Sequence, residues 1–151
     1  MLKSDDQEPV ATALTIAGSD SGGGAGIQAD MKSFSAHGVY GASVITAVTA
    51  QNTQLVIKVE AISPAMIKAQ IDAVLSDIRI DTIKIGMLAT PAVIDAVADG
   101  LADFRGPIVL DPVMVAKSGD ALLQDDAVSC MIDRLLPRAS LLTPNIPEAE
   151  R

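Results

Sequence analysis

The residues best suited to chemistry stand where short apolar runs of the sequence end. Four segments place carboxylate, amide, thioether or ammonium groups in this way, three of them together with glycine: residues 18–30, 49–53, 84–88 and 111–120. If the apolar runs are parallel strands, their carboxyl ends share one edge of a sheet, where ligands bind in open α/β folds. The sequence therefore predicts a ligand site at this edge, built from separate strand ends.

Residues 18–30 (GSDSGGGAGIQAD) form a glycine-rich turn before a predicted helix. Four glycines in five positions allow the backbone to approach a ligand and to present N–H groups at a helix start. The segment is not a P-loop, because no Gly-Lys-Ser/Thr follows. It is not the dinucleotide fingerprint either, because Ile27 stands where that motif has its third glycine. A flexible turn, with Asp30 favoured by the helix dipole, is an equally good interpretation.

Gln51 and Met87 are candidates for the recognition of a flat ring. The amide of Gln51 follows an apolar strand and offers a donor and an acceptor, which suits a heteroaromatic ring with an amino group. Gly86 permits close approach, and the thioether of Met87 could form a soft wall beside the ring. The alternative is that Gln51 only makes a turn and that Met87 belongs to the core.

Asp111 is the strongest candidate for a metal or phosphate contact, because it directly follows a wholly apolar strand. A carboxylate at a strand end can hold Mg²⁺, which in turn bridges phosphates. Lys117 could neutralise phosphate charge from a loop. Asn145 and Glu148, three residues apart at a predicted helix start, could supply further ligands to the metal. Glu148 could equally be a helix-cap residue.

Alternating apolar runs and amphipathic segments are predicted to position these residues. This pattern is typical of βαβ units, and hence of an α/β fold with a mostly parallel sheet between helices. Ser63-Pro64 and Thr90-Pro91 each combine a side-chain cap with proline at the first helical position. Gly38 is expected to end the first helix. The predicted strands are residues 11–17, 42–48, 55–59 (a candidate edge strand), 82–85, 108–110 and 141–142.

The composition argues against several classes of function. The 151 residues carry a formal net charge of −8 and only 2% aromatics, so we expect no binding to nucleic acid. No apolar run approaches the roughly 20 residues that cross a membrane. Cys130 is the only cysteine, so no internal disulfide can form, which favours the reducing cytoplasm. Residues 1–10 are predicted to be a disordered leader before a single domain, residues 11–151.

Five ordered motifs resemble the hydroxymethylpyrimidine and phosphomethylpyrimidine kinases of thiamine biosynthesis, members of the ribokinase-like superfamily. They are GSDSGGGAGIQAD, GASVITAVTAQNT, KIGMLAT, DPVMVAKSGD and LLTPNIPEAE, between about residue 14 and residue 150. The resemblance implies a three-layer, ribokinase-like α/β fold. It also implies the use of ATP and Mg²⁺ to phosphorylate a small molecule, 4-amino-5-hydroxymethyl-2-methylpyrimidine, and then its monophosphate.

The resemblance assigns roles to individual residues as well. Asp30 and Gln51 match the family residues that hydrogen-bond the aminopyrimidine. The implied pocket walls are Gly18, Met87 and Val113, and the implied organisers of Mg²⁺ and the ATP phosphates are Asp111, Asn145 and Glu148. The charge of Lys117 would add to the phosphate side.

The sequence departs from the family in one respect. Relatives continue beyond the TPNIPEAE segment to a Gly-Thr-Gly-Cys motif that forms the anion hole, whereas this sequence stops at Arg151. We therefore expect the C-terminal part of the fold and every catalytic residue to lie outside this chain, and negligible kinase activity from the chain alone. A pyridoxal kinase, and a truncated pyrimidine-binding protein without catalysis, remain alternatives. An exposed sheet edge would favour pairing of two copies as a homodimer.

Overall fold

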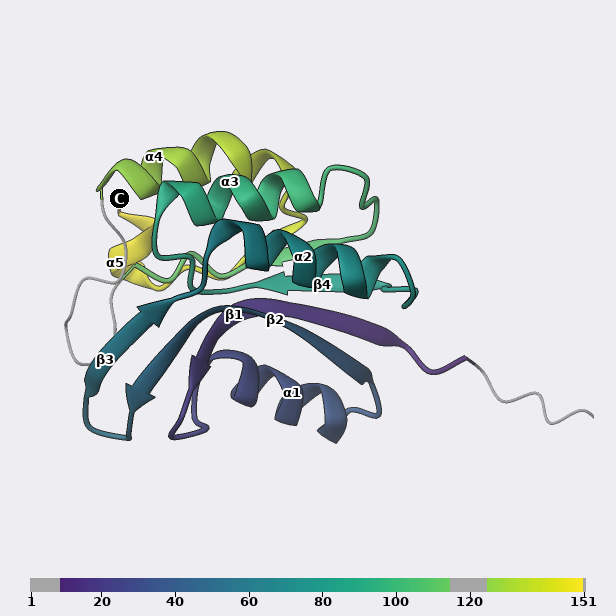
Figure 1. Cartoon of the computed structure of the whole chain (residues 1–151), viewed down its shortest axis with the longest axis horizontal. Helices are drawn as coiled ribbons and strands as arrows, with labels where there is room; N and C mark the ends of the chain where they lie inside the picture. The colour runs from purple at the N-terminus through teal and green to yellow at the C-terminus, as the bar shows by residue number, and fades with distance from the viewer. Residues whose placement is uncertain (1–8, 115–124, 151) are drawn as a thin grey trace, which may run out of the picture.

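A six-stranded sheet forms the centre of the computed structural model, which describes residues 9–114 and 125–150. Helix α1 covers one face of the sheet, and α2, α3 and α4 cover the other (Figure 1). The strands are β1 (Thr12–Asp20), β2 (Tyr40–Gln51), β3 (Val56–Ala61), β4 (Thr82–Ile85), β5 (Ile108–Leu110) and β6 (Leu141–Leu142). The helices are α1 (Gly26–Ala36), α2 (Pro64–Leu75), α3 (Pro91–Gly100), α4 (Asp125–Arg134), the 3₁₀ turn η1 (Leu136–Arg138) and α5 (Ile146–Ala149). The predicted three-layer α/β architecture is confirmed.

The strand order is β3-β2-β1-β4-β5-β6, and every neighbouring pair is parallel except β2 and β3. The centre of the sheet is buried on both faces: Leu14, Ile16 and Val44 share one face, and Ala13 and Ala17 are buried on the other. Burial on both sides is expected of parallel strands that have helices above and below. β3 lies at the edge of the sheet, as predicted, and begins one residue later than expected.

The two predicted cap-plus-proline helix starts are confirmed. The side chain of Ser63 accepts a hydrogen bond from the Met66 N–H, and that of Thr90 accepts one from the Val93 N–H. Each cap satisfies a backbone donor that has no partner within the helix. Gly38 follows α1 with φ of +70°, a conformation that glycine adopts at low cost.

β1 and β2 both run further than predicted. β1 continues through Gly18 to Asp20, because Ser19 pairs with Val48 and Asp20 pairs with Thr49 after a shift in register. Glycine and serine favour turns in isolation, but pairing with a neighbouring strand overrides that preference here. Gln51 is consequently the last residue of a strand and not part of a free turn.

Helix α4 is held against α3 by ion pairs as well as by packing. Arg134 contacts Asp95 at 2.9 Å and also pairs with Asp99, both of them on α3. Ile132 of this helix is exposed. Within the described ranges, no helix is both long and apolar enough to span a bilayer. The expected leader falls mostly outside the described part of the chain, which starts at Pro9.

Ile71→Ala tests the packing of α2 against α3. Ile71 is fully buried, and a Cβ added at Gly100 of α3 would lie 2.9 Å from its Cδ1 atom. Removing the side chain should leave a cavity and lower the free energy of unfolding by about 2–5 kcal/mol, measured by urea denaturation. Met66→Ala, at an exposed position of the same helix, should change it by less than about 1 kcal/mol. Equal effects of the two substitutions would contradict this packing.

Candidate functional site

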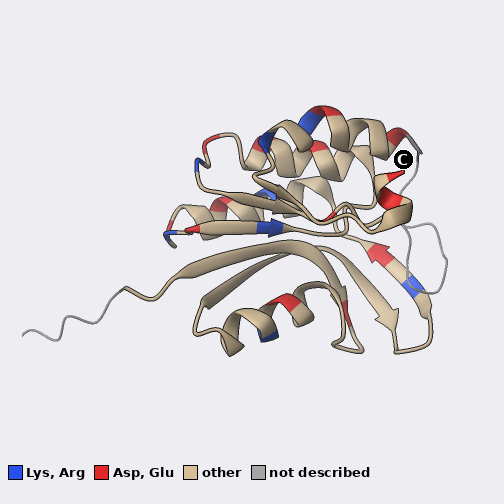
Figure 2. Cartoon of the chain, turned by 180° about the vertical axis from the view of Figure 1, so that it is seen from behind, with Lys and Arg blue, Asp and Glu red and all other residues tan. Residues whose placement is uncertain are grey.

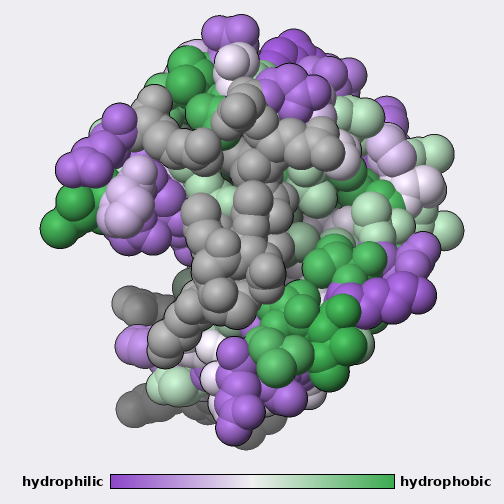
Figure 3. Space-filling model, turned by 90° about the vertical axis from the view of Figure 1, so that its left-hand side faces the viewer, coloured by the Kyte–Doolittle hydropathy of each residue, from purple (hydrophilic) through white to green (hydrophobic). Residues whose placement is uncertain are grey.

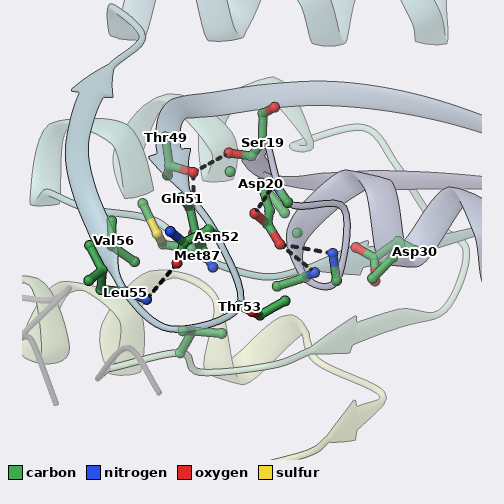
Figure 4. A pocket seen from close by; sticks show the side chains of 18 of the residues that line it. Ser19, Asp20, Asp30, Thr49, Gln51, Asn52, Thr53, Leu55, Val56 and Met87 are labelled. Carbon is green, nitrogen blue, oxygen red and sulfur yellow. Dashed lines mark hydrogen bonds between the residues drawn. The ribbon is translucent and has the colours of Figure 1, made fainter. Parts of the chain in front are cut away.

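A pocket of about 720 Å³ lies at the carboxyl edge of the sheet (Figure 4). Its walls come from the ends of β1 and β2, the glycine-rich turn, the start of β3 and the segments after β4 and β5. The four strand-end segments therefore contribute to one pocket. The predicted site residues that line it are Gly18, Asp30, Gln51, Met87, Asp111 and Val113.

The buried carboxylate of Asp20 organises the glycine-rich turn. It accepts hydrogen bonds from the backbone N–H groups of Gly22 (2.7 Å), Gly24 (2.9 Å) and Ala25 (2.9 Å) (Figure 4). These amides are thus satisfied internally, although the glycine pattern suggests that they serve a ligand. Sequence reasoning gave Asp20 no role. An Asp directly before Ser-Gly-Gly-Gly is nevertheless a signal for a carboxylate that accepts hydrogen bonds from the backbone N–H groups of the residues that follow it.

Close packing of α1 against the end of β1 brings Asp30 into the pocket. Gly26 starts the helix with φ of +56°, and a Cβ on it would lie 2.1 Å from the carbonyl oxygen of Gly18, so only glycine fits. One turn later, Asp30 Oδ2 accepts a hydrogen bond of 2.6 Å from Thr15 Oγ1 of β1. The carboxylate is therefore fixed by the strand beneath it.

Lys84 of β4 connects two of the predicted site carboxylates. Its Nζ lies 3.1 Å from Asp30 Oδ2 and 3.8 Å from Asp111 Oδ2. The three side chains are only 17–33% exposed, so water screens these charges weakly. Gly86 leaves room for the ammonium group, since a Cβ there would lie 3.0 Å from Nζ. Sequence reasoning missed Lys84; a lone lysine inside an apolar strand, two residues before a glycine, is the signal that could have identified it.

Hydrogen bonds tie the end of β2 to the glycine-rich turn. Ser21 Oγ donates to the Gln51 carbonyl oxygen at 2.7 Å, and the Gln51 N–H donates back to Ser21 Oγ at 2.8 Å. Thr49 Oγ1 donates to the Ser19 carbonyl oxygen at 2.9 Å and lies 3.2 Å from Gln51 Oε1 (Figure 4). These contacts hold the amide of Gln51 in the wall of the pocket.

Asp111 carries a charge that its surroundings only partly compensate. Burial raises the pKa of Asp111 above its ordinary value of 3.8, the cation of Lys84 opposes this rise, and the carboxylates of Glu148 and Asp30 add to it. An additional cation beside Asp111 would therefore stabilise its ionised form.

Asn145 and Glu148 form a helix cap and do not line the pocket. Asn145 Oδ1 accepts from the Glu148 N–H at 3.0 Å, while Glu148 Oε2 accepts from the Asn145 N–H at 2.9 Å, which is a capping box. The other oxygen of the buried Glu148 accepts from the Met114 N–H at 3.3 Å. The cap thus braces the chain just after Asp111. Lys117 lies outside the described residues.

The carboxylate of Asp111 suits Mg²⁺ chemically, because this ion prefers oxygen ligands. Within residues 9–114 and 125–150, no three His, Cys, Asp or Glu side chains gather so that they could hold a metal ion by themselves. Mg²⁺ commonly takes one or two protein carboxylates and completes its shell with water and phosphate oxygens. The residues therefore fit a metal brought with phosphates and not an ion bound by protein side chains alone.

Comparison with known proteins identifies relatives over nearly the whole chain. Residues 20–151 match the family model for phosphomethylpyrimidine kinase. A hydroxymethylpyrimidine/phosphomethylpyrimidine kinase from Rhizobium meliloti (strain 1021) is 61% identical over 139 residues, which are 92% of this chain and 52% of that protein. The chain thus spans about half the length of the curated relatives that it matches.

Solved structures agree with this relationship. The crystal structure of phosphomethylpyrimidine kinase from Clostridium difficile 630 matches with a TM-score of 0.86 and 52% identity, over 93% of this chain and 61% of that one. An ADP complex of Bacillus subtilis pyridoxal kinase matches with a TM-score of 0.82 and 37% identity, over 94% of this chain and 54% of that one. The fold is therefore shared with two kinds of vitamin kinase.

Asp111→Asn tests the electrostatics of the pocket. The unfolded chain loses the Asp111 proton near the ordinary pKa of 3.8, whereas the folded chain keeps it to higher pH. The folded state therefore loses stability as the pH rises from 3.8 through the raised pKa of Asp111, because the carboxylate must ionise in a half-buried place. Asparagine cannot ionise, so the variant does not lose this stability. The variant should have a higher urea midpoint than the wild type at neutral pH, and the difference should vanish below pH 3.8.

Asp103→Asn, at a fully exposed position, is the control and should leave the urea midpoint nearly unchanged across this pH range. An Asp111→Asn variant that is less stable than the wild type at neutral pH would contradict the raised pKa of Asp111 in the folded chain.

Proposed function

Since the chain belongs to the phosphomethylpyrimidine kinase family, we propose that the whole protein phosphorylates 4-amino-5-hydroxymethyl-2-methylpyrimidine and then its monophosphate in thiamine biosynthesis. The phosphoryl donor in this proposal is ATP with Mg²⁺. The observation that carries the proposal is the meeting of Asp30, Gln51 and Asp111 in one pocket. Asp30 and Gln51 can hydrogen-bond a ring, and Asp111 can face phosphates.

Gln51 and Asp30 can hydrogen-bond the aminopyrimidine. The Thr49 hydroxyl has one hydrogen, which the Ser19 carbonyl accepts, so the Gln51 amide satisfies Thr49 best by turning its NH₂ group toward it. The side-chain amide oxygen of Gln51 is then available to accept from the amino group of the ring. Within the described residues, both hydrogen bonds of the Asp30 carboxylate use Oδ2, which leaves Oδ1 as a second acceptor.

Gly18, Met87 and Val113 provide the walls that the flat ring requires. A Cβ added at Gly18 would lie 3.6 Å from Met87 Sδ, so the glycine leaves space beside the thioether. The backbone of Met87 is anchored, since its carbonyl oxygen accepts from Thr46 Oγ1 at 2.8 Å. A fixed backbone with a soft side chain suits a ring that must be held but also released.

Asp111 marks the phosphate side of the pocket in this proposal. When bound, Mg²⁺ with ATP would supply charge stabilisation for the transferred phosphoryl group. Asp111 would then contact the metal directly or through water, and Lys84 would hold the carboxylate in position. Asn145 and Glu148 act as positioning residues, since their cap fixes Met114, three residues after Asp111.

Titration calorimetry with 4-amino-5-hydroxymethyl-2-methylpyrimidine tests the proposal, because every residue assigned to the ring lies in this chain. We expect saturable binding at one site without nucleotide. Pyridoxal, titrated in parallel, tests the alternative that the solved neighbours raise, and we expect it to bind more weakly than the pyrimidine. Tighter binding of pyridoxal, or no binding of the pyrimidine, would reject the proposed substrate.

Gln51→Ala should weaken binding of the pyrimidine about tenfold, which is the loss expected for one hydrogen bond in a pocket. Calorimetry of the variant measures this change. Met66→Ala, exposed on α2 outside the pocket lining, is the control and should bind as the wild type does. Unchanged affinity in Gln51→Ala would remove Gln51 from the proposed ring contacts.

A further inference from the structure

Lys84 is the only cationic side chain that lines the described part of the ligand pocket. The charged residues in this lining are Asp20, Asp30, Lys84 and Asp111. Of the strands that the structure describes, only β3 and β4 carry a lysine or arginine (Figure 2), and Lys58 of β3 does not line the pocket. An anionic ligand in this part of the pocket is therefore attracted by one side chain, that of Lys84.

The glycine-rich turn does not offer a second site for an anion. Its N–H groups at Gly22, Gly24 and Ala25 already donate to the carboxylate of Asp20. A phosphate at this place would have to displace these hydrogen bonds and would lie beside a negative charge. The turn therefore shapes the wall of the pocket but is unsuited to a phosphate.

The β3 side of the pocket is equally unsuited to a phosphate. Residues 51–56 line this side, and none of them is charged. Figure 3 shows a hydrophobic patch low on this face of the molecule, on the side where β3 forms the edge of the sheet. A phosphate would lose water here without gaining a cation in return. We therefore expect the charged end of a ligand on the other side of the pocket, where β4 and β5 end.

The ammonium group of Lys84 has hydrogen-bond donors to spare. Its Nζ donates to Asp30 Oδ2 at 3.1 Å, whereas Asp111 Oδ2 lies at 3.8 Å, beyond hydrogen-bond length. An ammonium group has three N–H donors, so two of them have no acceptor within the described residues. The side chain is 23% exposed and lines the pocket, so a ligand can reach these two donors.

We propose that Lys84 recognises the phosphate of the monophosphate substrate by donating hydrogen bonds to its oxygen atoms. The inference rests on the proposed function, in which Asp30 and Gln51 hold the ring and Asp111 marks the phosphate side. Because Nζ contacts both carboxylates, a substituent that extends from the ring at Asp30 toward Asp111 passes beside it.

The charge of the substituent decides how strongly Lys84 binds it. A hydroxymethyl group offers the ammonium a neutral oxygen, whereas a phosphate offers charged ones. A hydrogen bond between two charged groups is shorter and stronger than one with a neutral partner. Lys84 therefore contributes more to binding of the monophosphate than to binding of the alcohol, and it is a specificity-determining residue for the second phosphorylation.

Titration calorimetry tests the inference with two ligands, the monophosphate and the unphosphorylated alcohol, both without Mg²⁺ and without nucleotide. The quantity compared is the ratio of the two dissociation constants. Lys84→Met keeps the length of the side chain but removes its charge. Its affinity for the monophosphate should fall at least about tenfold more than its affinity for the alcohol. If Lys84 only held Asp30 in place, both ligands would lose affinity equally, because they share the same ring.

Asp111→Asn provides a second measurement in a variant that retains Lys84. Without a metal ion, the Asp111 carboxylate repels a phosphate bound at Nζ, which lies 3.8 Å from Oδ2. The asparagine should therefore strengthen binding of the monophosphate about threefold or more relative to the alcohol. Circular dichroism and urea unfolding establish whether each variant is folded, and this second variant tests the inference even if Lys84→Met does not fold.

Lys68→Met is the matched control. It removes the same charge from an exposed ion pair with Asp72 on α2, away from the pocket lining, and should leave the ratio unchanged. The inference would be overturned by equal losses for both ligands in Lys84→Met, by an unchanged ratio in Asp111→Asn, or by a wild type that binds only the alcohol. These results would leave the proposed ring contacts standing. A wild type that binds neither ligand would reject the proposed function as well.

Discussion

The ammonium group of Lys84 is the charge on which the arrangement of the pocket depends. It lies between Asp30, which α1 brings from one side, and Asp111, which follows β5 on the other. Without this cation, two half-buried carboxylates would face each other across the edge of the sheet and repel each other. In the proposed function, a central lysine would allow one pocket to present an acceptor to a ring and a second carboxylate to a metal or phosphate.

The parallel sheet explains why residues so distant in sequence can share that cation. β1, β4 and β5 are neighbours and point the same way, so the residues at or after their carboxyl ends converge. Helix α1 adds Asp30 because Gly26 lets its first turn approach the end of β1. The glycine-rich turn is held by Asp20 and has its shape before any ligand arrives, which reduces the entropy cost of binding.

Local rules predicted much of this structure from sequence. The proline-capped helix starts and the apolar strands depend on short-range signals, and they agree with the structure. Sequence reasoning gave no role to Asp20 or Lys84 and named the cap at Glu148 only as an alternative, because the contacts that decide between these roles are set by three-dimensional packing. The extension of β1 past Ala17 and of β2 past Val48 was not predicted for the same reason: pairing between the strands continues there and, in β1, overrides the turn preference of glycine and serine.

A crystal structure of the chain with 4-amino-5-hydroxymethyl-2-methylpyrimidine would test the account most directly. We expect the ring to lie between Gly18, Met87 and Val113, with its amino group within hydrogen-bond distance of Gln51 or Asp30. The hydroxymethyl oxygen should point toward Asp111. A ring bound outside this pocket, or one whose hydroxymethyl group points away from Asp111, would contradict the assignment of the two sides of the site.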